Sequence, residues 1–374
     1  MKILVVSNIY PSFKYPASGV FVYNLIQQFP KLGHEVTVIS PENILSIGAK
    51  KVKSYGVENC TVYRPFSFSA SNKQIGSFNT YRITELAQIK GIQRTVAKHN
   101  LEFDFVYAHF MMNGFIAVNA LKKYKKPVFV AIGESDLPLL TKMYPKDYFE
   151  QSIRLISGFV AVSSKLRNQL IGYGVPESKI FLKPNAVDFT KFYQRDKAEM
   201  RKKYKLPMDL KLVAFVGRFM DHKGPLRVLE AVQNLDNVGA LFMGKGPQEP
   251  TGPSVVFNES VPSYKIPELL SAADVFVLPT QREGSCNAIA EAIACGLPVV
   301  SSNIPEVMDQ CNPSFSILVD PLDVKAIKSA IESILGDEVK STEMSNNALE
   351  HSKNFEIGER ASSILDFIKS MMEE

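Results

Sequence analysis

The sequence predicts an α/β protein made of two doubly wound parallel sheets, each covered by helices. Short runs of β-branched and other apolar residues alternate with segments of helical periodicity along nearly the whole chain, which is typical of parallel strands joined by crossover helices. The alternation restarts near residue 187, and 374 residues suffice for two domains that each bury a core. We therefore expect a first domain over residues 1–187, a second over 188–357, and a separate terminal segment over 358–374.

The first domain is expected to contain six buried strands. A helix should follow the first strand, because Phe21, Leu25, Phe29 and Leu32 share one stripe and Gly33 stands where a helix commonly ends. The expected strands are Ile3–Ser7, Glu35–Ser40, Phe105–Ala108, Val128–Ile132, Phe159–Val162 and Ile180–Lys183.

The second domain repeats this pattern. Its first strand ends in Gly217, and a helix should then begin in Leu226–Gln233. The expected strands are Lys211–Gly217, Gly239–Met243, Val255–Phe257, Val275–Pro279, Leu297–Ser301 and Ser316–Val319. The terminal segment is amphipathic, so it could cap either domain. Its apolar face consists of Ala361, Ile364, Leu365, Ile368 and Met371.

Composition indicates a globular protein, with 45% hydrophobic and 22% charged residues. The opening apolar run is closed by Asn8 and Pro11, which makes it too short for the core of a signal peptide, and no stretch is long enough to span a bilayer. We therefore expect a soluble, cytoplasmic protein. The 4 cysteines show no C-x-x-C spacing, so neither a zinc site nor a disulfide framework is expected.

Charge is divided unevenly along the chain. Residues 1–186 hold 23 Lys and Arg against 11 Asp and Glu, whereas residues 187–374 hold 20 against 27. A basic first half suits an anionic partner, such as the inner face of a membrane or a phosphorylated acceptor. The lysine-rich segment Lys122–Lys126 is interpreted as a solvated turn, with membrane contact as the alternative. The sequence has no basic motif interleaved with aromatic residues, so nucleic-acid binding is not expected.

Candidate ligand-binding residues follow the strands, because open α/β sheets bind ligands beyond the carboxyl ends of their strands. Arg218 directly follows Gly217, and Lys223 comes later in the same loop. Two cations in one loop suit a diphosphate, whose growing negative charge they can neutralise during bond cleavage. A solvated basic loop is the alternative for this pair.

Two carboxylates lie eight residues apart in the next candidate turn. Glu283 falls in a loop, and Glu291 falls about one turn inside the helix that should begin near Asn287 or Ala288. The amides of Asn287 and Ala288 are then expected to be free donors for a phosphate oxygen. Glu291 lies among apolar neighbours and needs a partner or a ligand. We expect Glu283 to face a sugar and Glu291 to reach a vicinal diol such as a ribose.

The chain resembles glycosyltransferase family 4 in these motifs. The resemblance rests on the E-x7-E segment, on the G-R-F-x3-K-G turn that begins at Gly217, and on Gly244–Pro247. Pro184–Asp188 and the opening K-I-L-V-V-S-N-I-Y-P-S with its later Ser-Gly add to it, so essentially the whole chain is covered in order. The resemblance implies the GT-B fold, with two facing Rossmann-like domains and an interdomain cleft.

The resemblance also implies roles for the residues that match. Arg218 and Lys223 would bind the donor diphosphate, and Gly244 would belong to the donor-binding site. Glu283 would contact the donor sugar and help stabilise the transition state, and Glu291 would hold the ribose. The amides of Asn287 and Ala288 would complete the phosphate cradle.

Further matches lie in the first domain. Gly19 would let the backbone approach the diphosphate, and His109, which follows a strand, would support the reacting sugar in the cleft. The family usually has His-Gly-Ser-Asp in one tract of this domain. This chain has Glu134 and Asp136 in that tract, and we expect both carboxylates on the acceptor side. Ser285-Cys286 replaces bulkier versions and leaves the fit of the donor sugar open.

The implied activity is that of a retaining, metal-independent hexosyltransferase. The donor would be a UDP or GDP sugar, and the acceptor a saccharide or a lipid-linked saccharide in surface polysaccharide or glycoconjugate synthesis. No cofactor is expected, and no D-x-D tract offers a metal site. Two other classes stay open: a non-hydrolysing nucleotide-sugar epimerase, and a non-catalytic nucleotide-sugar-binding partner of another transferase.

Overall fold

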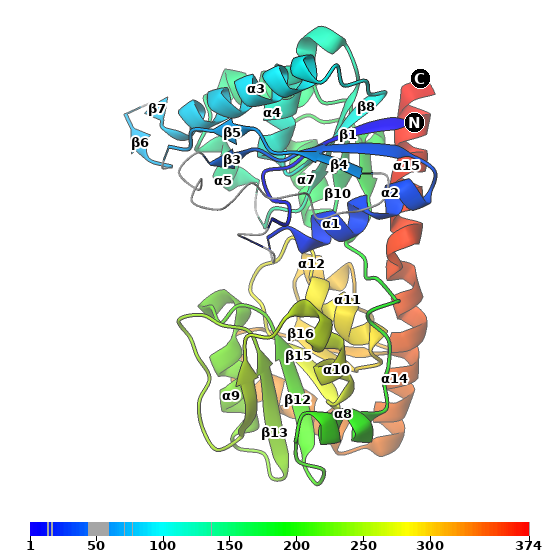
Figure 1. Ribbon diagram of the computed structural model, residues 1–374. Helices are drawn as coiled ribbons and strands as arrows, with labels where there is room; N and C mark the ends of the chain where they lie inside the picture. Colours follow the sequence, from blue (N-terminus) through cyan, green and yellow to red (C-terminus); the bar gives the residue numbers. More distant parts are fainter. Residues whose placement is uncertain are drawn as a thin grey trace. The chain divides into compact units, whose positions relative to one another are not determined.

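The computed structural model describes residues 1–12, 15, 18–43, 60–70, 72–76, 78–135 and 137–373. The chain divides into two compact units (Figure 1). The first unit comprises Met1–Lys183 together with Ile357–Glu374, and the second comprises Pro184–Glu356. Each unit is built around its own parallel sheet, as the sequence pattern predicts.

The sheet of the first unit has the strand order β11-β10-β9-β8-β1-β2-β4. The order reverses next to β1, so β1 and β8 flank the topological switch point of this sheet. All six predicted strands are present, whereas the short edge strand β4 was not predicted, because its residues are largely half-exposed and show no buried run. The strands are β1 (Lys2–Val6), β2 (Glu35–Ile39), β4 (Cys60–Tyr63), β8 (Phe105–His109), β9 (Val128–Ile132), β10 (Gly158–Ala161) and β11 (Ile180–Leu182).

The predicted first helix is two helices, α1 (Val20–Ile26) and α2 (Gln28–Lys31). Pro30 has no N–H with which to continue the helical ladder, and this accounts for the break. The predicted apolar stripe is wrong at Leu32, because this residue caps α2 and is 42% exposed. Two helices pack on strands of the sheet, α4 (Met111–Leu121) and α7 (Ser164–Gly172), and two pack on α4, namely α3 (Tyr81–Lys98) and α6 (Lys146–Arg154). The remaining short elements are the helix α5 (Pro138–Thr141) and the strands β3 (Glu42–Asn43), β5 (Phe66–Ser67), β6 (Gln74–Ile75) and β7 (Phe78–Asn79).

The terminal helix α15 (Ile357–Glu373) belongs to the first unit, where it packs against α1, α2 and β10. Phe367 stacks on Phe181 with ring centroids 5.3 Å apart and meets the edge of Phe129 at 6.3 Å. The apolar face expected from the sequence is buried except at Met371. None of the helices in the described ranges combines the length and apolar content that a membrane span requires.

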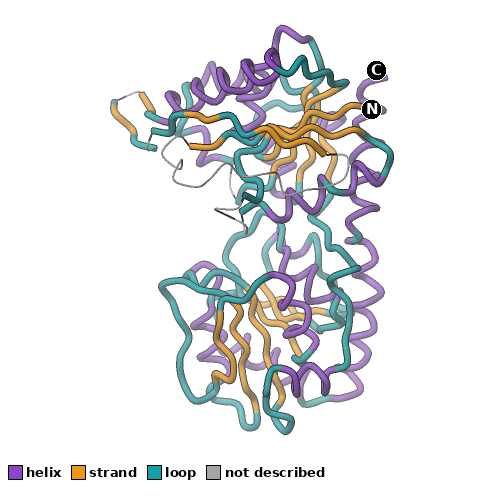
Figure 2. Tube along the Cα trace, viewed as in Figure 1, coloured by secondary structure: helices purple, strands orange, loops and turns teal. Residues whose placement is uncertain are grey.

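The sheet of the second unit has the order β14-β13-β12-β15-β16-β17, with its switch point between β12 and β15. Helices flank its strands (Figure 2). The strands are β12 (Lys211–Val216), β13 (Val238–Met243), β14 (Val255–Glu259), β15 (Val275–Leu278), β16 (Val299–Ser302) and β17 (Ser316–Val319). The helices are α8 (Lys197–Lys203), α9 (Pro225–Val232), α10 (Ile266–Ser271), α11 (Asn287–Ala294), α12 (Pro305–Met308), α13 (Val324–Leu335) and α14 (Glu338–Ser352).

The boundary between the units falls after Lys183, four residues before the predicted one. The Val187 N–H donates to the Phe355 carbonyl over 2.7 Å, and Val187 pairs with Glu356 in an isolated parallel bridge. These contacts hold the segment after Pro184 in the second unit. The two points at which the chain passes between units are thereby tied together within that unit.

Candidate active site

The candidate residues of the second unit lie at its switch point. The loop after β12 carries Arg218 and Lys223, and the loop after the neighbouring strand β15 carries Glu283. The His222 carbonyl joins the two loops, because it accepts hydrogen bonds from the Gln281 N–H at 2.7 Å and from the Thr280 hydroxyl at 3.2 Å. The sheet topology thus brings together residues that lie 60 positions apart in the chain.

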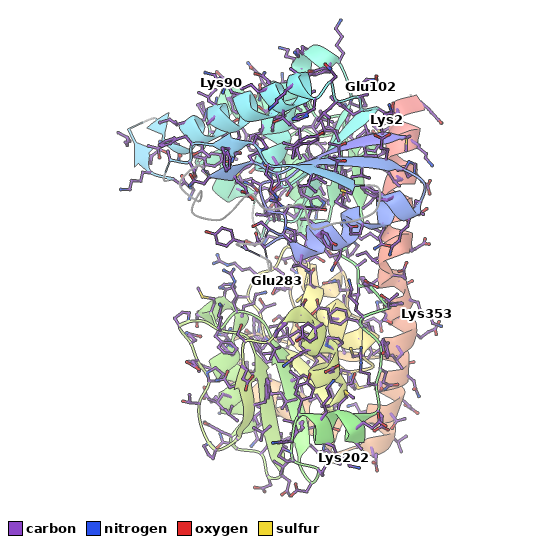
Figure 3. The ribbon with its side chains drawn as sticks, viewed as in Figure 1. Lys2, Lys90, Glu102, Lys202, Glu283 and Lys353 are labelled. Atoms are coloured by element: carbon purple, nitrogen blue, oxygen red, sulfur yellow. The ribbon has the colours of Figure 1, made fainter. Side chains whose placement is uncertain are left out.

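Lys223 and Glu283 form an ion pair and hydrogen bond. The Lys223 side chain is 19% exposed and that of Glu283 only 9%, so the pair is largely removed from water. The Glu283 N–H lies 3.5 Å from its acceptor, a carboxylate oxygen of Glu306. Figure 3 places Glu283 at the end of the second unit where the loops after the strands gather. The two groups that the sequence assigned to the diphosphate and the sugar are therefore in direct contact.

More positive charge surrounds this pair. Arg218 is exposed, and its carbonyl accepts a hydrogen bond from the Met220 N–H at 2.8 Å. Burial, followed by the charges of Arg282, Lys223 and Arg218, lowers the pKa of His222. Arg282, which no motif singled out, thus joins the predicted cations, and together they form a field suited to an anionic ligand.

The start of α11 differs from the prediction at Asn287. The Asn287 N–H donates to the Ser285 carbonyl at 3.0 Å and is not a free donor. The cause is Cys286, whose φ of −84° and ψ of 80° are those of an inverse γ-turn, which closes this hydrogen bond. The Ala288 N–H donates to no oxygen in the described part of the chain, so it keeps its predicted availability.

Glu291 lies one turn inside α11 and is half-buried. Burial raises the pKa of its carboxyl to about 8. Within the described ranges this carboxyl has neither a hydrogen-bond partner nor an ion-pair partner. A half-buried, unpaired acid of this kind is suited to binding neutral hydroxyl groups, as the sequence-based assignment to a ribose requires.

Gly244 and Gly19 allow close backbone approaches. A Cβ at Gly244 would lie 1.9 Å from the Gly217 carbonyl oxygen, so only glycine lets the loop after β13 support the Arg218 loop. Gly19 precedes α1 with a φ of +66°, and a Cβ there would lie 2.4 Å from the Ile9 carbonyl oxygen. Both glycines position their loops, whether or not a ligand touches them.

His109 ends β8, at the switch point of the first unit. Its carbonyl accepts a hydrogen bond from the Asn113 side chain at 2.6 Å, and the same amide donates to the Asn8 side chain at 3.0 Å. Burial, with a smaller contribution from Arg360, lowers the pKa of His109 to about 3, so the ring is neutral. Its Nε2 atom is buried and has no partner among the described residues. A neutral imidazole can hydrogen-bond a hydroxyl but cannot supply a proton at neutral pH.

The Glu134 carboxylate caps the start of α4, a role that the sequence did not indicate. Its carboxylate accepts hydrogen bonds from the Met111 N–H at 2.6 Å and from the Gly133 N–H at 3.0 Å. Burial raises the pKa of Glu134 to about 7, although these N–H donors act in the opposite direction. Asp136, the other predicted acceptor-side residue, lies outside the described residues.

Two positioning residues were not predicted. The Asn185 N–H donates to the Ser285 hydroxyl at 3.1 Å, and its side chain donates to the Asn287 side chain at 2.9 Å. The buried Gln310 accepts a hydrogen bond from the Cys286 N–H at 2.8 Å. Asn185 belongs to a motif that carried the resemblance, whereas Gln310 lies in no motif and only the fold reveals it. Among the described residues, no cluster of His, Cys, Asp and Glu could hold a metal ion.

Comparisons with known proteins identify the family of this chain. The family model described as Glycosyltransferase Family 4 matches residues 18–191, and the model described as Glycosyl transferases group 1 matches residues 196–351. The chain belongs to glycosyltransferase family 4. This family 4 chain is 28% identical to TuaC of Bacillus subtilis (strain 168), a protein named as a teichuronic acid biosynthesis glycosyltransferase, over 97% of both chains.

Solved structures confirm the predicted GT-B fold of this family 4 glycosyltransferase. Sucrose-phosphate synthase from Thermosynechococcus elongatus superposes with a TM-score of 0.81 and 17% identity, over 100% of this chain and 99% of that chain. HepE from Anabaena, solved in complex with UDP, superposes with a TM-score of 0.75 and 16% identity, over 99% of this chain and 100% of that chain.

Proposed function

We propose that this glycosyltransferase moves a sugar from a nucleoside-diphosphate sugar to a saccharide or lipid-linked acceptor, with retention of anomeric configuration. The observation that carries the proposal is the Lys223–Glu283 pair beside the start of α11, at the switch point of the second unit. It sets a cation and a carboxylate where a GT-B sheet receives its ligand, so one donor can engage both.

The donor is proposed to bind through complementary charges. Lys223 and Arg218 would contact the diphosphate, the Ala288 N–H would donate to a phosphate oxygen, and Glu291 would accept hydrogen bonds from the ribose hydroxyls. The UDP complex of HepE supports a uridine nucleotide as the first donor to test. Arg282, whose charge acts on His222 together with that of Lys223, would add to the positive field.

The chemistry is proposed to proceed on one face of the sugar. The bond between the anomeric carbon and the diphosphate oxygen breaks, the acceptor oxygen bonds to that carbon from the same side, and the acceptor proton passes to the departing diphosphate. Lys223 and Arg218 would stabilise the leaving charge without a metal. Glu283 would stabilise the positively charged sugar, and His109, being neutral, would orient a sugar hydroxyl without giving up a proton.

The biological setting is proposed to be assembly of a cell-surface polysaccharide, which the similarity to TuaC supports. We propose that the enzyme works in the cytoplasm at the inner face of the membrane, where a lipid-linked acceptor would be presented. The excess of basic residues in the first half of the chain supports this location.

A panel of UDP and GDP sugars tests the proposal. With a saccharide acceptor present, one donor should release nucleoside diphosphate, and chelation of divalent metals should leave the rate unchanged. Glu283→Gln should reduce that rate by at least about 100-fold. Recovery of an altered nucleotide sugar without acceptor would instead indicate an epimerase, and donor binding without turnover would indicate a non-catalytic partner.

A further inference from the structure

The outer face of α3 in the first unit combines apolar and cationic side chains. Ile83, Leu86, Lys90, Arg94 and Lys98 are all exposed and follow one another at spacings of three or four residues, so they form one stripe. The stripe is apolar toward the start of the helix and cationic toward its end. The opposite face is buried and includes Thr84, Glu85, Gln88, Gly91, Ile92, Thr95 and Val96.

A second segment adds apolar side chains beside this stripe. Residues 65–70 and 72–73 run along α3, held by hydrogen bonds from the Ala70 N–H to the Thr84 hydroxyl at 2.8 Å and from the Lys73 N–H to the Thr80 hydroxyl at 2.9 Å. Figure 1 shows β5 along α3 and the β6–β7 hairpin at its start. We define the α3 patch as Phe66, Phe68, Ile75, Ile83 and Leu86, which are 43–65% exposed, with the cations Lys73, Lys90 and Arg94.

The charge of this region has one sign at its surface. Residues 60–98 contain six Lys and Arg but a single acid, Glu85. Glu85 is fully buried, where it pairs with Arg82 at 2.5 Å and accepts a hydrogen bond from the Tyr148 hydroxyl. Lys90 and Arg94 form no ion pair with the described residues, and Figure 3 shows Lys90 on the side of α3 that faces away from the sheet. Within residues 60–98, the exposed apolar groups are therefore accompanied by cations and by no exposed acid.

The combination of exposed apolar groups and cations distinguishes between two partners for this surface, a second copy of the chain and a lipid bilayer. A second copy of the chain would place cations against cations, which opposes association. An anionic bilayer would pair its phosphates with the cations and take the apolar side chains into its interfacial layer. We propose that the α3 patch binds the surface of an anionic phospholipid bilayer. The purpose of membrane binding rests on the proposed function, because a lipid-linked acceptor lies in a membrane. The binding itself requires no turnover and can be tested separately.

The Lys122–Lys126 turn provides a contrast. Its four lysines are exposed, but Leu121 before it is buried and Tyr124 within it is half-buried. The turn offers charge without large exposed apolar groups. Its lysines therefore serve as a matched control for charge alone.

Co-sedimentation of the full chain with vesicles tests the proposal. The vesicles contain equal parts of phosphatidylglycerol and phosphatidylcholine, or phosphatidylcholine alone. The parent should bind the anionic vesicles, and its binding should weaken in high salt. The pairs Ile83→Ser with Leu86→Ser and Lys90→Glu with Arg94→Glu should each lower partitioning at least about tenfold. The controls Leu155→Ser with Ile171→Ser, exposed apolar positions elsewhere in the first unit, and Lys122→Glu with Lys125→Glu should stay within about twofold of the parent.

Several results would overturn the proposal: no binding by the parent at low salt, equal binding to uncharged vesicles, unchanged binding by both patch variants, or an equal loss in the lysine-turn control. Light scattering that shows a parent dimer abolished by Ile83→Ser with Leu86→Ser would assign the face to self-association instead. Unfolding temperatures verify that the variants fold. Patch variants should keep turnover on a water-soluble acceptor, and Glu283→Gln should keep vesicle binding, so a failure of the membrane surface and a failure of the proposed function are distinguishable.

Discussion

Replacing Lys223 by methionine would leave the Glu283 carboxylate without its cation in a largely buried position. Removing one partner of a buried ion pair costs about 3–5 kcal/mol, because the remaining charge is desolvated and uncompensated. Water still reaches 19% of the Lys223 side chain and 9% of that of Glu283, so we expect the lower end, about 3 kcal/mol. In a unit of this size that loss lowers the midpoint of thermal unfolding by about 6–12 °C.

The double variant Lys223→Met with Glu283→Gln separates stability from chemistry. It removes both charges, so most of the lost stability should return, and a double-mutant cycle should give a coupling of at least about 2 kcal/mol. Transfer should stay at least about 100-fold below the parent in all three variants, because each lacks a group that we assign to the transition state. Calorimetric unfolding and nucleoside-diphosphate release supply the two measurements. Additive losses of stability, with no coupling, would refute the buried pair.

Two further predictions concern Glu291 and Gly244. The raised pKa of Glu291, about 8 against its ordinary value near 4.5, means that the folded chain carries an extra proton between these pH values, so its stability falls as the pH rises through this window. Glu291→Gln should therefore gain stability relative to the parent above pH 8, and it should abolish a proton release on UDP binding at pH 7 that calorimetry in different buffers detects in the parent. Gly244→Ala should lower stability by about 3 kcal/mol because a Cβ there would clash with the Gly217 carbonyl oxygen. The control Gly172→Ala, with open space around it, should leave stability in chemical denaturation unchanged or raise it by up to about 1 kcal/mol.

The sequence predicted the fold well because buried parallel strands carry a strong local signal. The strands β8 and β9 are buried at every position, and both were predicted within one residue of their ends. The edge strand β4 lacks this signal, since it is paired on one side and its side chains are partly exposed. The break after α1 depends on Pro30, whose effect competes with the apolar stripe and was not anticipated.

The candidate site was predictable where residues sit in motifs beside strands. The switch point between β12 and β15 follows from strand order, and it explains why Lys223 meets Glu283. The occupied Asn287 amide was not predictable, because it depends on the dihedral angles of Cys286. Gln310 supports the same turn from a distant part of the chain, through a contact that no local pattern encodes.

The α3 patch also could not be predicted from the sequence. The run of lysines at Lys122–Lys126 is conspicuous in the sequence, whereas the α3 patch assembles from a strand, a hairpin and one stripe of a helix. Its apolar members resemble core residues until the fold shows that they are exposed. Exposure is a tertiary property, so composition alone could indicate a basic domain but not its apolar surface.

Hydrogen–deuterium exchange of the full chain with and without UDP tests most directly whether the switch point of the second unit receives the donor. We predict that UDP slows exchange in peptides that cover residues 217–224 and 283–291, and that Lys223→Met weakens this protection. Protection confined to other parts of the chain, with these two segments unchanged at saturating UDP, would contradict the site.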